Sequence, residues 1–220
     1  AVWYLMFSIP FLKYSKKFKN DLNIKSKKEN FIINIFNTLK NRNKIKYLIA
    51  RMVYSDGLIT LFSFGGIYAS GTFDFSFDEI IIFGIAINIS AATGAYLFGL
   101  IENKIGIKNV IMISLISLII ICVIILVIKS KILFWSFGIS IGFFIGSIQS
   151  SSRTALITVS SEKDLNQMFG LYAVSGKVTN FLGPMLVASF TLYFESQRAG
   201  MASILIFLIV GLILLRKTKI

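Results

Sequence analysis

Two charged side chains near the middle of long apolar segments are the residues of this sequence best placed to do chemistry. Asp56 lies within an apolar segment at about 47–70, and Lys177 lies within another at about 168–192. A charge at the centre of a membrane helix costs roughly 2.5–3.5 kcal/mol on insertion scales, so such residues usually face a protein interior and find partners. We predict that Asp56 and Lys177 form a substrate or ion-coupling site. A purely stabilising ion pair or interhelical hydrogen bond is the alternative.

Other residue types limit the chemistry that such a site can perform. Asn88 and Asn180 are further candidates for substrate or ion coupling. The sequence contains no histidine, and Cys122 is its single cysteine, so it has neither a disulfide framework nor metal-ligand spacing. The apolar segments contain no Ser/His, HExxH or paired-carboxylate arrangement, and the chain has no P-loop. We therefore predict no enzyme activity, no cofactor and no metal site.

A second polar group lies where the apolar segments reach the side that we predict to be cytoplasmic. Arg51 lies near that end of its segment, and Gln149 and Arg153 are four residues apart, on one helical face. We predict that Arg51, Gln149 and Arg153 form a cytoplasmic gate. The alternative is that Arg51 extends its charge to the membrane surface and that the other two residues anchor their helix.

The elements that must position these residues are transmembrane helices. Hydrophobic residues make up 55% of the 220-residue chain, and only 15% are charged, against about 25% in a soluble domain. One span takes roughly 20 apolar helical residues, and the alternating pattern of barrel strands is not found. We predict an all-α transmembrane domain over 47–220 with six spans, at about 47–70, 79–101, 109–128, 132–152, 168–192 and 199–215.

The predicted spans differ in polarity and in small residues. Spans 109–128 and 199–215 contain almost only aliphatic and small residues, which is typical of helices that face lipid. Pro184, directly after Gly183, predicts a kink or break in the 168–192 span. A four-residue repeat of glycine in another span predicts close helix packing, at Gly138, Gly142 and Gly146.

Two segments precede residue 47. Residues 1–12 are apolar but too short to span a bilayer, so we interpret them as the end of a truncated transmembrane helix and the chain as a fragment. Residues 13–46 form a basic, cytoplasmic linker in which Ser26 and Glu29 have the spacing of a helix capping box. The apolar face that follows predicts an amphipathic helix on the membrane surface, and a flexible basic loop is the alternative.

The positions of the basic residues predict the orientation. With the 13–46 linker inside, 19 of the 23 Lys and Arg residues lie on that side, and only Lys129, Lys131 and Arg198 lie on the other. Cytoplasmic loops carry an excess of Lys and Arg, so both chain ends are predicted to be cytoplasmic in a multi-pass protein of the bacterial inner membrane. The net charge of +13 therefore reflects topology, and we predict no nucleic-acid partner.

Several blocks of the sequence resemble the vacuole effluxer family of the major facilitator superfamily. In chain order they are ARMVYSDG from Ala50, GGIYA from Gly65, FGI from Phe83, the segment around Gln149 and Arg153, FGLYAVSGK from Phe169, and FLGP from Phe181. The resemblance runs from about residue 31 to the end of the chain.

One loop resembles the superfamily's connection between the second and third helices of each half. It runs from Gly99 to Gly106, with Glu102 and Lys104 at the acidic and basic positions of that motif. Asn103 stands where the motif usually has a second acid.

The resemblance implies twelve helices in two six-helix halves with alternating access around a central cavity. This chain would supply the end of helix six, the central linker and helices seven to twelve. The implied partners are an N-terminal six-helix half, the lipid bilayer and a small polar solute. Eukaryotic members are associated with amino-acid efflux from the vacuole. We therefore expect a secondary active transporter. The alternatives are a permease subunit powered by a partner ATPase and a half-size bundle that acts as a homodimer.

Overall fold

The computed structural model describes residues 8–10, 40–161 and 164–219 of the chain. By its contacts the chain divides into two units, Ala1–Ile35 and Phe36–Ile220. Of the first unit only residues 8–10 are described, and they are helical. The rest of the predicted helix end at 1–12, and the predicted linker as far as residue 39, lie outside the described residues.

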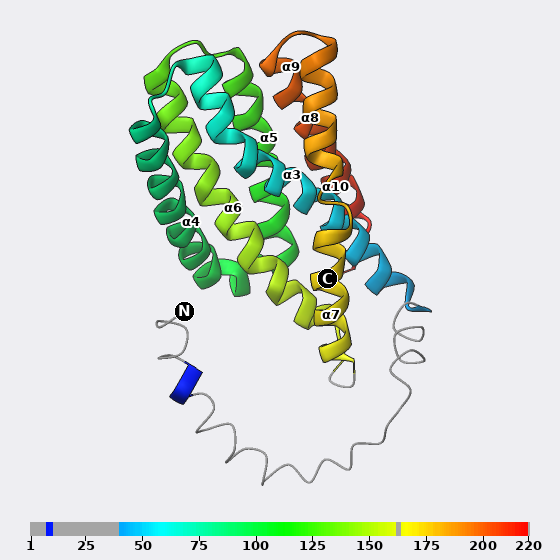
Figure 1. Cartoon of the computed structure of the whole chain (residues 1–220). Coiled ribbons are helices and arrows are strands. Elements are labelled where there is room, and N and C mark those ends of the chain that lie inside the picture. The colour runs from blue at the N-terminus through cyan, green and yellow to red at the C-terminus, as the bar shows by residue number, and fades with distance from the viewer. Residues whose placement is uncertain (1–7, 11–39, 162–163, 220) are drawn as a thin grey trace. The chain divides into compact units, whose positions relative to one another are not determined.

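Eight helices make up the described part of the second unit (Figure 1). They are α3 (Arg42–Phe73), α4 (Phe77–Ile105), α5 (Ile107–Val127), α6 (Lys131–Val159), α7 (Leu165–Val178), α8 (Leu182–Tyr193), α9 (Gln197–Ala202) and α10 (Ile204–Arg216). The predicted all-α class is confirmed. Helix α3 begins inside the segment that the sequence assigned to the linker, because the Asn41 side chain caps it by accepting hydrogen bonds from the backbone N–H groups of Asn43 and Lys44.

Four helical segments are long and apolar enough to cross a membrane: α4, α5, α6 and the stretch Gln197–Arg216 that α9 and α10 form together. The other two predicted spans correspond to α3 and to the pair α7 and α8. Helix α3 contains Arg51 and Asp56, and α7 and α8 have only 14 and 12 residues. The polar residues and the break that mark the candidate site therefore lie in the helices that depart from a simple apolar span.

Helices α4 and α6 lie side by side, and α5 packs against α6 (Figure 1). We call the α4–α6 contact the glycine seam, after the glycines that line it: Gly94, Gly138, Gly142 and Gly146. A Cβ atom at Gly142 would lie 2.5 Å from the carbonyl oxygen of Ile87, and one at Gly146 would meet the carbonyl group of Ala91. The prediction that these glycines serve close packing is confirmed.

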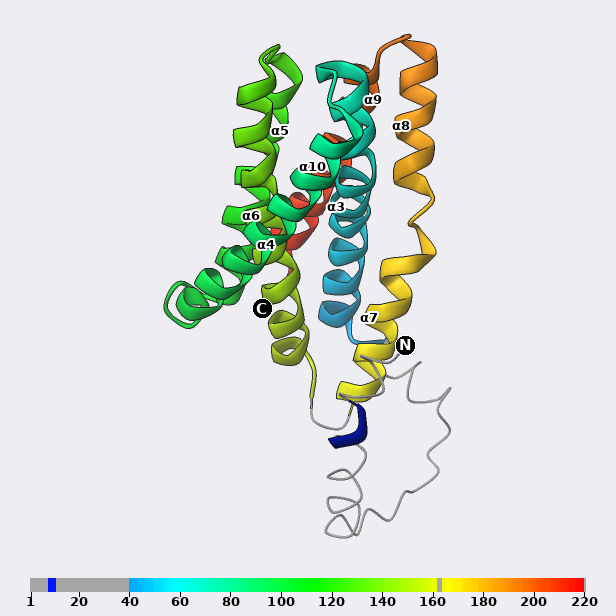
Figure 2. The same cartoon turned by 60° about the vertical axis from the view of Figure 1, so that its left-hand side comes forward.

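The predicted 168–192 span is broken between α7 and α8, which follow one another in Figure 2 with a non-helical joint between them. The joint is Thr179–Phe181, one turn before the Pro184 that predicted it. A proline ring clashes with the carbonyl group four residues earlier, here that of Asn180, and proline is tolerated in the first turn of a helix. The helix therefore ends before Asn180 and restarts with Pro184 in the first turn of α8.

Candidate functional site

The most deeply buried charged residue among the predicted site residues is Asp56, in the middle of α3. The residue is 2% exposed, and its Oδ1 atom has no hydrogen-bond partner in the described structure. The Thr60 hydroxyl donates to the backbone carbonyl oxygen of Asp56 over 2.6 Å, so this hydroxyl does not serve the carboxylate. Burying an acid without a full set of partners is costly. An unpaired oxygen of this kind therefore marks a candidate binding group.

The joint between α7 and α8 lies against this part of α3. Thr179 Oγ1 and Asn180 Oδ1 are also buried without hydrogen-bond partners, and Thr179 lies close enough to act on the Asp56 carboxylate. Gly183 brings the first turn of α8 onto α3, since a Cβ atom there would lie 3.3 Å from the Asp56 carbonyl oxygen and would also meet Thr60. Asp56 is thus brought beside the joint that holds the predicted site residue Asn180.

Arg51 connects α3 to α7. Its Nη1 atom donates to the carbonyl oxygen of Tyr172 over 2.6 Å and to Ser175 Oγ over 3.2 Å, and its Cζ atom lies 3.6 Å from the centre of the Tyr172 ring. The guanidinium occupies the space that a side chain at Gly176 would fill. Arg51 therefore binds a neighbouring helix. Its positive charge also acts on Asp56.

We call Arg51, Asp56, Thr179 and Asn180 the Asp56 cluster. An acid, a hydroxyl and an amide, each with an unpaired oxygen, lie at or beside the interruption of the helix, and Arg51, with an unpaired Nε, lies on α3 five residues before Asp56. In transporters, interrupted helices present free backbone groups to ions and substrates. The cluster can therefore bind a proton or a small cation at Asp56.

Lys177 does not join this cluster. It is exposed, and the ion pairs among the described residues are Lys44–Asp164 and Lys131–Glu79. The interpretation of Asp56 and Lys177 as an ion pair is therefore wrong for this structure. Successive helical residues are about 100° apart, so the face of α7 that places Gly176 against α3 turns Lys177 away from it.

The remaining predicted coupling and gate residues are exposed in the described unit. Asn88 donates from Nδ2 to the carbonyl oxygen of Gly84 in its own helix, over 2.8 Å. Gln149 and Arg153 are both exposed on α6. These three side chains and Lys177 place polar groups on the outside of helices that are otherwise apolar.

The predicted inner-loop motif is divided between buried and exposed positions. Glu102 is 9% exposed and accepts a hydrogen bond from Ser151 Oγ over 2.8 Å, which joins α4 to α6. Lys104 is exposed, and no atom lies within 4 Å of a Cβ placed on Gly99. Gly106 has a φ of 93°, a conformation that glycine adopts without strain, and it is the single residue between α4 and α5.

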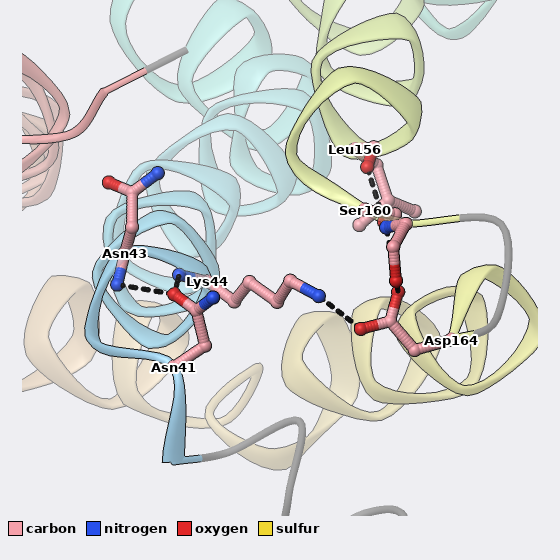
Figure 3. Close-up of polar contacts among 7 residues, drawn as sticks. Asn41, Asn43, Lys44, Leu156, Ser160 and Asp164 are labelled. Atoms are coloured by element: carbon pink, nitrogen blue, oxygen red, sulfur yellow. Dashed lines mark hydrogen bonds and ion pairs between the residues drawn. The ribbon is translucent and has the colours of Figure 1, made fainter.

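A partly buried ion pair at the start of α3 was not foreseen from the sequence (Figure 3). Lys44 donates to Asp164, at the start of α7, and the two side chains are 11% and 15% exposed. Burial acts to raise the pKa of Asp164, but hydrogen bonds from Lys44 and Ser161 outweigh it and hold this pKa below its ordinary value. The pair fastens α7 to α3 about two helical turns before Arg51.

The helix-facing residues of α7 were also missed as site residues. Tyr172 and Ser175 lie on the face of α7 that meets α3, and Thr179, four residues after Ser175, continues this face directly after the helix ends. Their periodicity is the signal that could have identified them. The Lys44–Asp164 pair has no such signal, because 120 residues separate its members.

Comparison with known proteins gives two matches. A family model described as "Vacuole effluxer Atg22 like" matches residues 1–219. A curated protein of Bacillus subtilis strain 168, described as the uncharacterized MFS-type transporter YxiO, is 24% identical over 223 residues. The alignment covers 98% of this chain and 51% of that protein, so the chain spans about half the length of the curated relative it matches.

Proposed function

We propose that this chain, which belongs to the Atg22-like vacuole effluxer family of MFS-type transporters, forms part of a secondary active transporter that moves a small polar solute by alternating access. Family membership makes the chain part of a multi-pass membrane protein and a transporter, not an enzyme. Our finer proposal is amino-acid export across a bacterial inner membrane, with both chain ends cytoplasmic. The six spans are proposed to act as the C-terminal half of a twelve-helix fold.

The observation that carries the proposal is the buried Asp56, whose Oδ1 atom has no hydrogen-bond partner, beside the joint of α7 and α8. When Asp56 is ionised, its charge favours a cation at the joint, and binding of a proton or cation removes the cost of the unpaired oxygen. Occupied and empty states then differ in the free energy of the α3–α7 contact. Such a difference is what couples a bound ion to a conformational equilibrium.

Exposed polar residues support a second wall opposite this unit. Lys177 lies near the middle of a predicted span yet is exposed, as are Asn88 and Gln149. Charged and polar groups at membrane depth usually face other helices or a water-filled cavity. We propose that a second six-helix half covers this surface and that the solute passes between the halves.

We propose a gate at the end of the bundle where α3 begins. Arg51 and the Lys44–Asp164 pair hold α7 against α3, and Arg153 and Gln149 lie exposed on α6. Opening on this side would require the contacts between α3 and α7 to separate. Gln149 and Arg153 are then available to contact the opposite half.

The proposal is tested by transport. The full gene product is reconstituted into liposomes, and uptake of a panel of radiolabelled amino acids is measured with an imposed proton or sodium gradient. We expect gradient-dependent uptake of at least one amino acid, and we expect Asp56→Asn to lower it at least tenfold. Asp74→Asn is the matched control, because Asp74 is an exposed carboxylate in a left-handed turn, where asparagine fits.

Two results would count against the proposal. If Asp56→Asn and Lys177→Ala both transport at the wild-type rate, neither residue takes part in coupling. If the wild-type protein moves no amino acid under either gradient, the proposed substrate class is wrong. Loss of uptake in Asp74→Asn as well would mean that carboxylate removal acts on folding rather than on the site.

A further inference from the structure

Basic residues gather where the end of α10 meets the starts of α3 and α5. Arg216 is the last residue of α10, and Lys217 and Lys219 follow it; Lys108 lies in the first turn of α5, and Arg42 is the first residue of α3. These three helix ends lie at the same end of the bundle (Figure 2). We call the five residues the basic cluster.

Hydrogen bonds between segments far apart in the chain hold this region together. Lys108 Nζ donates to the carbonyl oxygens of Arg216 over 3.0 Å and Thr218 over 2.5 Å. Asn43 donates from Nδ2 to the carbonyl oxygen of Lys219 over 2.6 Å, and its Oδ1 atom accepts from the backbone N–H of Lys219 over 2.9 Å. Thr218 is 2% exposed. The residues that follow α10 are therefore fixed against the starts of α3 and α5.

The basic cluster carries more positive charge than these contacts need. Cations near the C-terminus of a helix normally balance its dipole, and at α10 the Lys108 ammonium already does so. The other contacts use main-chain atoms of Arg216 and Lys219. The side chains of Arg42, Arg216, Lys217 and Lys219 are exposed, and neither ion pair among the described residues includes them.

The acids at this end of the described bundle are engaged elsewhere. Glu102 accepts a hydrogen bond from Ser151, and Asp164 is paired with Lys44. Like charges that are held close together repel one another, and a bound counter-ion relieves this repulsion. The basic cluster therefore suits an anion that comes from outside the described residues.

An exposed aliphatic face on α10 leads directly to this charge. Ile206, Ile209 and Ile213 are 47%, 42% and 50% exposed. They are spaced at three and four residues, and Arg216 and Lys217 continue the spacing, so all five share one helical face. A molecule that lies along this face meets hydrocarbon first and then two positive charges.

Helix α5 offers a similar surface beside it. Helices α5 and α10 pack against one another, and Ile113, Ile116 and Ile120 of α5 are exposed. The sequence predicted both helices to face lipid. The combination of an exposed aliphatic surface with exposed cations at its end matches the acyl chains and the phosphate of a phospholipid.

We propose that the basic cluster and the exposed isoleucines of α5 and α10 bind an anionic phospholipid. Its phosphate lies at Arg216 and Lys217, and its acyl chains lie along the two helices. A zwitterionic lipid fits less well, because its ammonium group is repelled by the same cations. The proposal rests on the chain's being a membrane protein and is independent of the transport site proposed at Asp56.

The test counts the lipids that the protein retains. The full gene product is reconstituted in liposomes with equal amounts of phosphatidylglycerol and phosphatidylethanolamine, extracted in a mild detergent and examined by native mass spectrometry. We expect at least fivefold more phosphatidylglycerol than phosphatidylethanolamine on the protein. Excess glycerol 3-phosphate, which has the charge but no acyl chains, is expected to displace little of the bound lipid.

Three variants locate the binding at the basic cluster. Arg216→Gln with Lys217→Gln removes two exposed charges and leaves the main-chain carbonyl that Lys108 bonds. We expect this double variant to lower the preference for phosphatidylglycerol at least threefold. Arg216→Lys with Lys217→Arg keeps both charges and is expected to retain the preference. Lys129→Gln is the matched control, because Lys129 is an exposed lysine at the other end of α5.

Equal retention of the two lipids by the wild-type protein would overturn the proposal, as would an unchanged preference in the Arg216→Gln, Lys217→Gln variant. An equal loss in the charge-conserving variant or in Lys129→Gln would show that the charge of the basic cluster is not the cause. If glycerol 3-phosphate displaced the bound lipid completely, the cluster would be a phosphate site without a role for acyl chains, and the proposed occupant would be wrong.

Discussion

The contact between α4 and α6 and the contact between α3 and α7 join neighbouring helices in opposite ways. In the glycine seam, Gly142 and Gly146 bring the backbone of α6 onto the carbonyl groups of Ile87 and Ala91. Between α3 and α7 the contact is made by the long side chain of Arg51 and by the Lys44–Asp164 pair. At Gly142 and Gly146 the first contact is made by main-chain atoms, whereas the second depends on polar side chains that can exchange partners.

The difference shows where this unit carries unsatisfied polar groups. Arg51, Asp56, Thr179 and Asn180 account for four of the five buried polar side-chain atoms without partners in the described structure. Buried polar groups are normally paired, and the helices of the glycine seam obey that rule in the described residues. The exceptions concentrate at the α3–α7 contact and its joint. Stability and binding capacity are thus assigned to different helix pairs.

The largest expected effect is the loss of close packing in the glycine seam. In Gly146→Ala the new Cβ would meet the Ala91 carbonyl group and lie 2.8 Å from its Cα atom, so the helices must separate. We expect a loss of about 1–3 kcal/mol in the free energy of unfolding, as in overpacked cores. Thermal unfolding in detergent measures it. Gly84→Ala is the control on α4, where the Cβ meets nothing within 4 Å. If Gly146→Ala and Gly84→Ala lowered the stability equally, close packing in the glycine seam would not be the cause.

An intermediate effect is expected from Arg51→Lys. A lysine keeps the charge but lacks the planar group that donates to Tyr172 and lies over its ring. We expect a loss of about 1–2 kcal/mol, from one charge-assisted hydrogen bond and the cation–π contact. The same thermal measurement on Arg153→Lys, an exposed arginine of α6, is expected to give almost no change. If the two variants unfold alike, the guanidinium geometry at α3 and α7 is unimportant.

The smallest expected effect concerns the Lys44–Asp164 pair and pH. Because the pKa of folded Asp164 is held below its ordinary value, the ion pair stabilises the fold above about pH 4 and is lost as pH falls through the folded pKa. We expect Asp164→Asn to be less stable than wild type by about 1 kcal/mol at pH 7, with the gap closing in acid. Melting temperatures from pH 7 downward measure it, with Asp78→Asn as an exposed control. A gap that persists in acid would show that charge is not the cause.

Much of the fold was predictable because a bilayer restricts the possible structures. Every backbone group must be bonded within the segment, so long apolar segments form helices, and the helices do follow the apolar runs from Arg42 to Arg216. The break before Pro184 and the packing of the seam glycines also followed from local chemistry. The exact position of the joint, Thr179–Phe181, was not predicted. The steric effect of a proline acts on the preceding turn, so the helix is interrupted before Pro184 and not at it.

The candidate site was predictable only in part. Asp56 was found because a charge in an apolar segment is conspicuous, and Asn180 lies at the joint beside it. Lys177 is not paired with Asp56 in the described structure, because distance along a span gives depth but not rotation about the helix axis. Partners such as Thr179 and Tyr172 are determined by how α7 rotates against α3, and that rotation depends on tertiary packing.

The single-residue connection at Gly106 limits how far one helix can slide along its neighbour. A residue advances the chain by at most about 3.8 Å, whereas a shift of one helical turn is about 5.4 Å. Since α4 ends at Ile105 and α5 begins at Ile107, the chain has no spare length at this point. An axial displacement of α4 by one turn must therefore carry α5 with it or unwind the end of a helix.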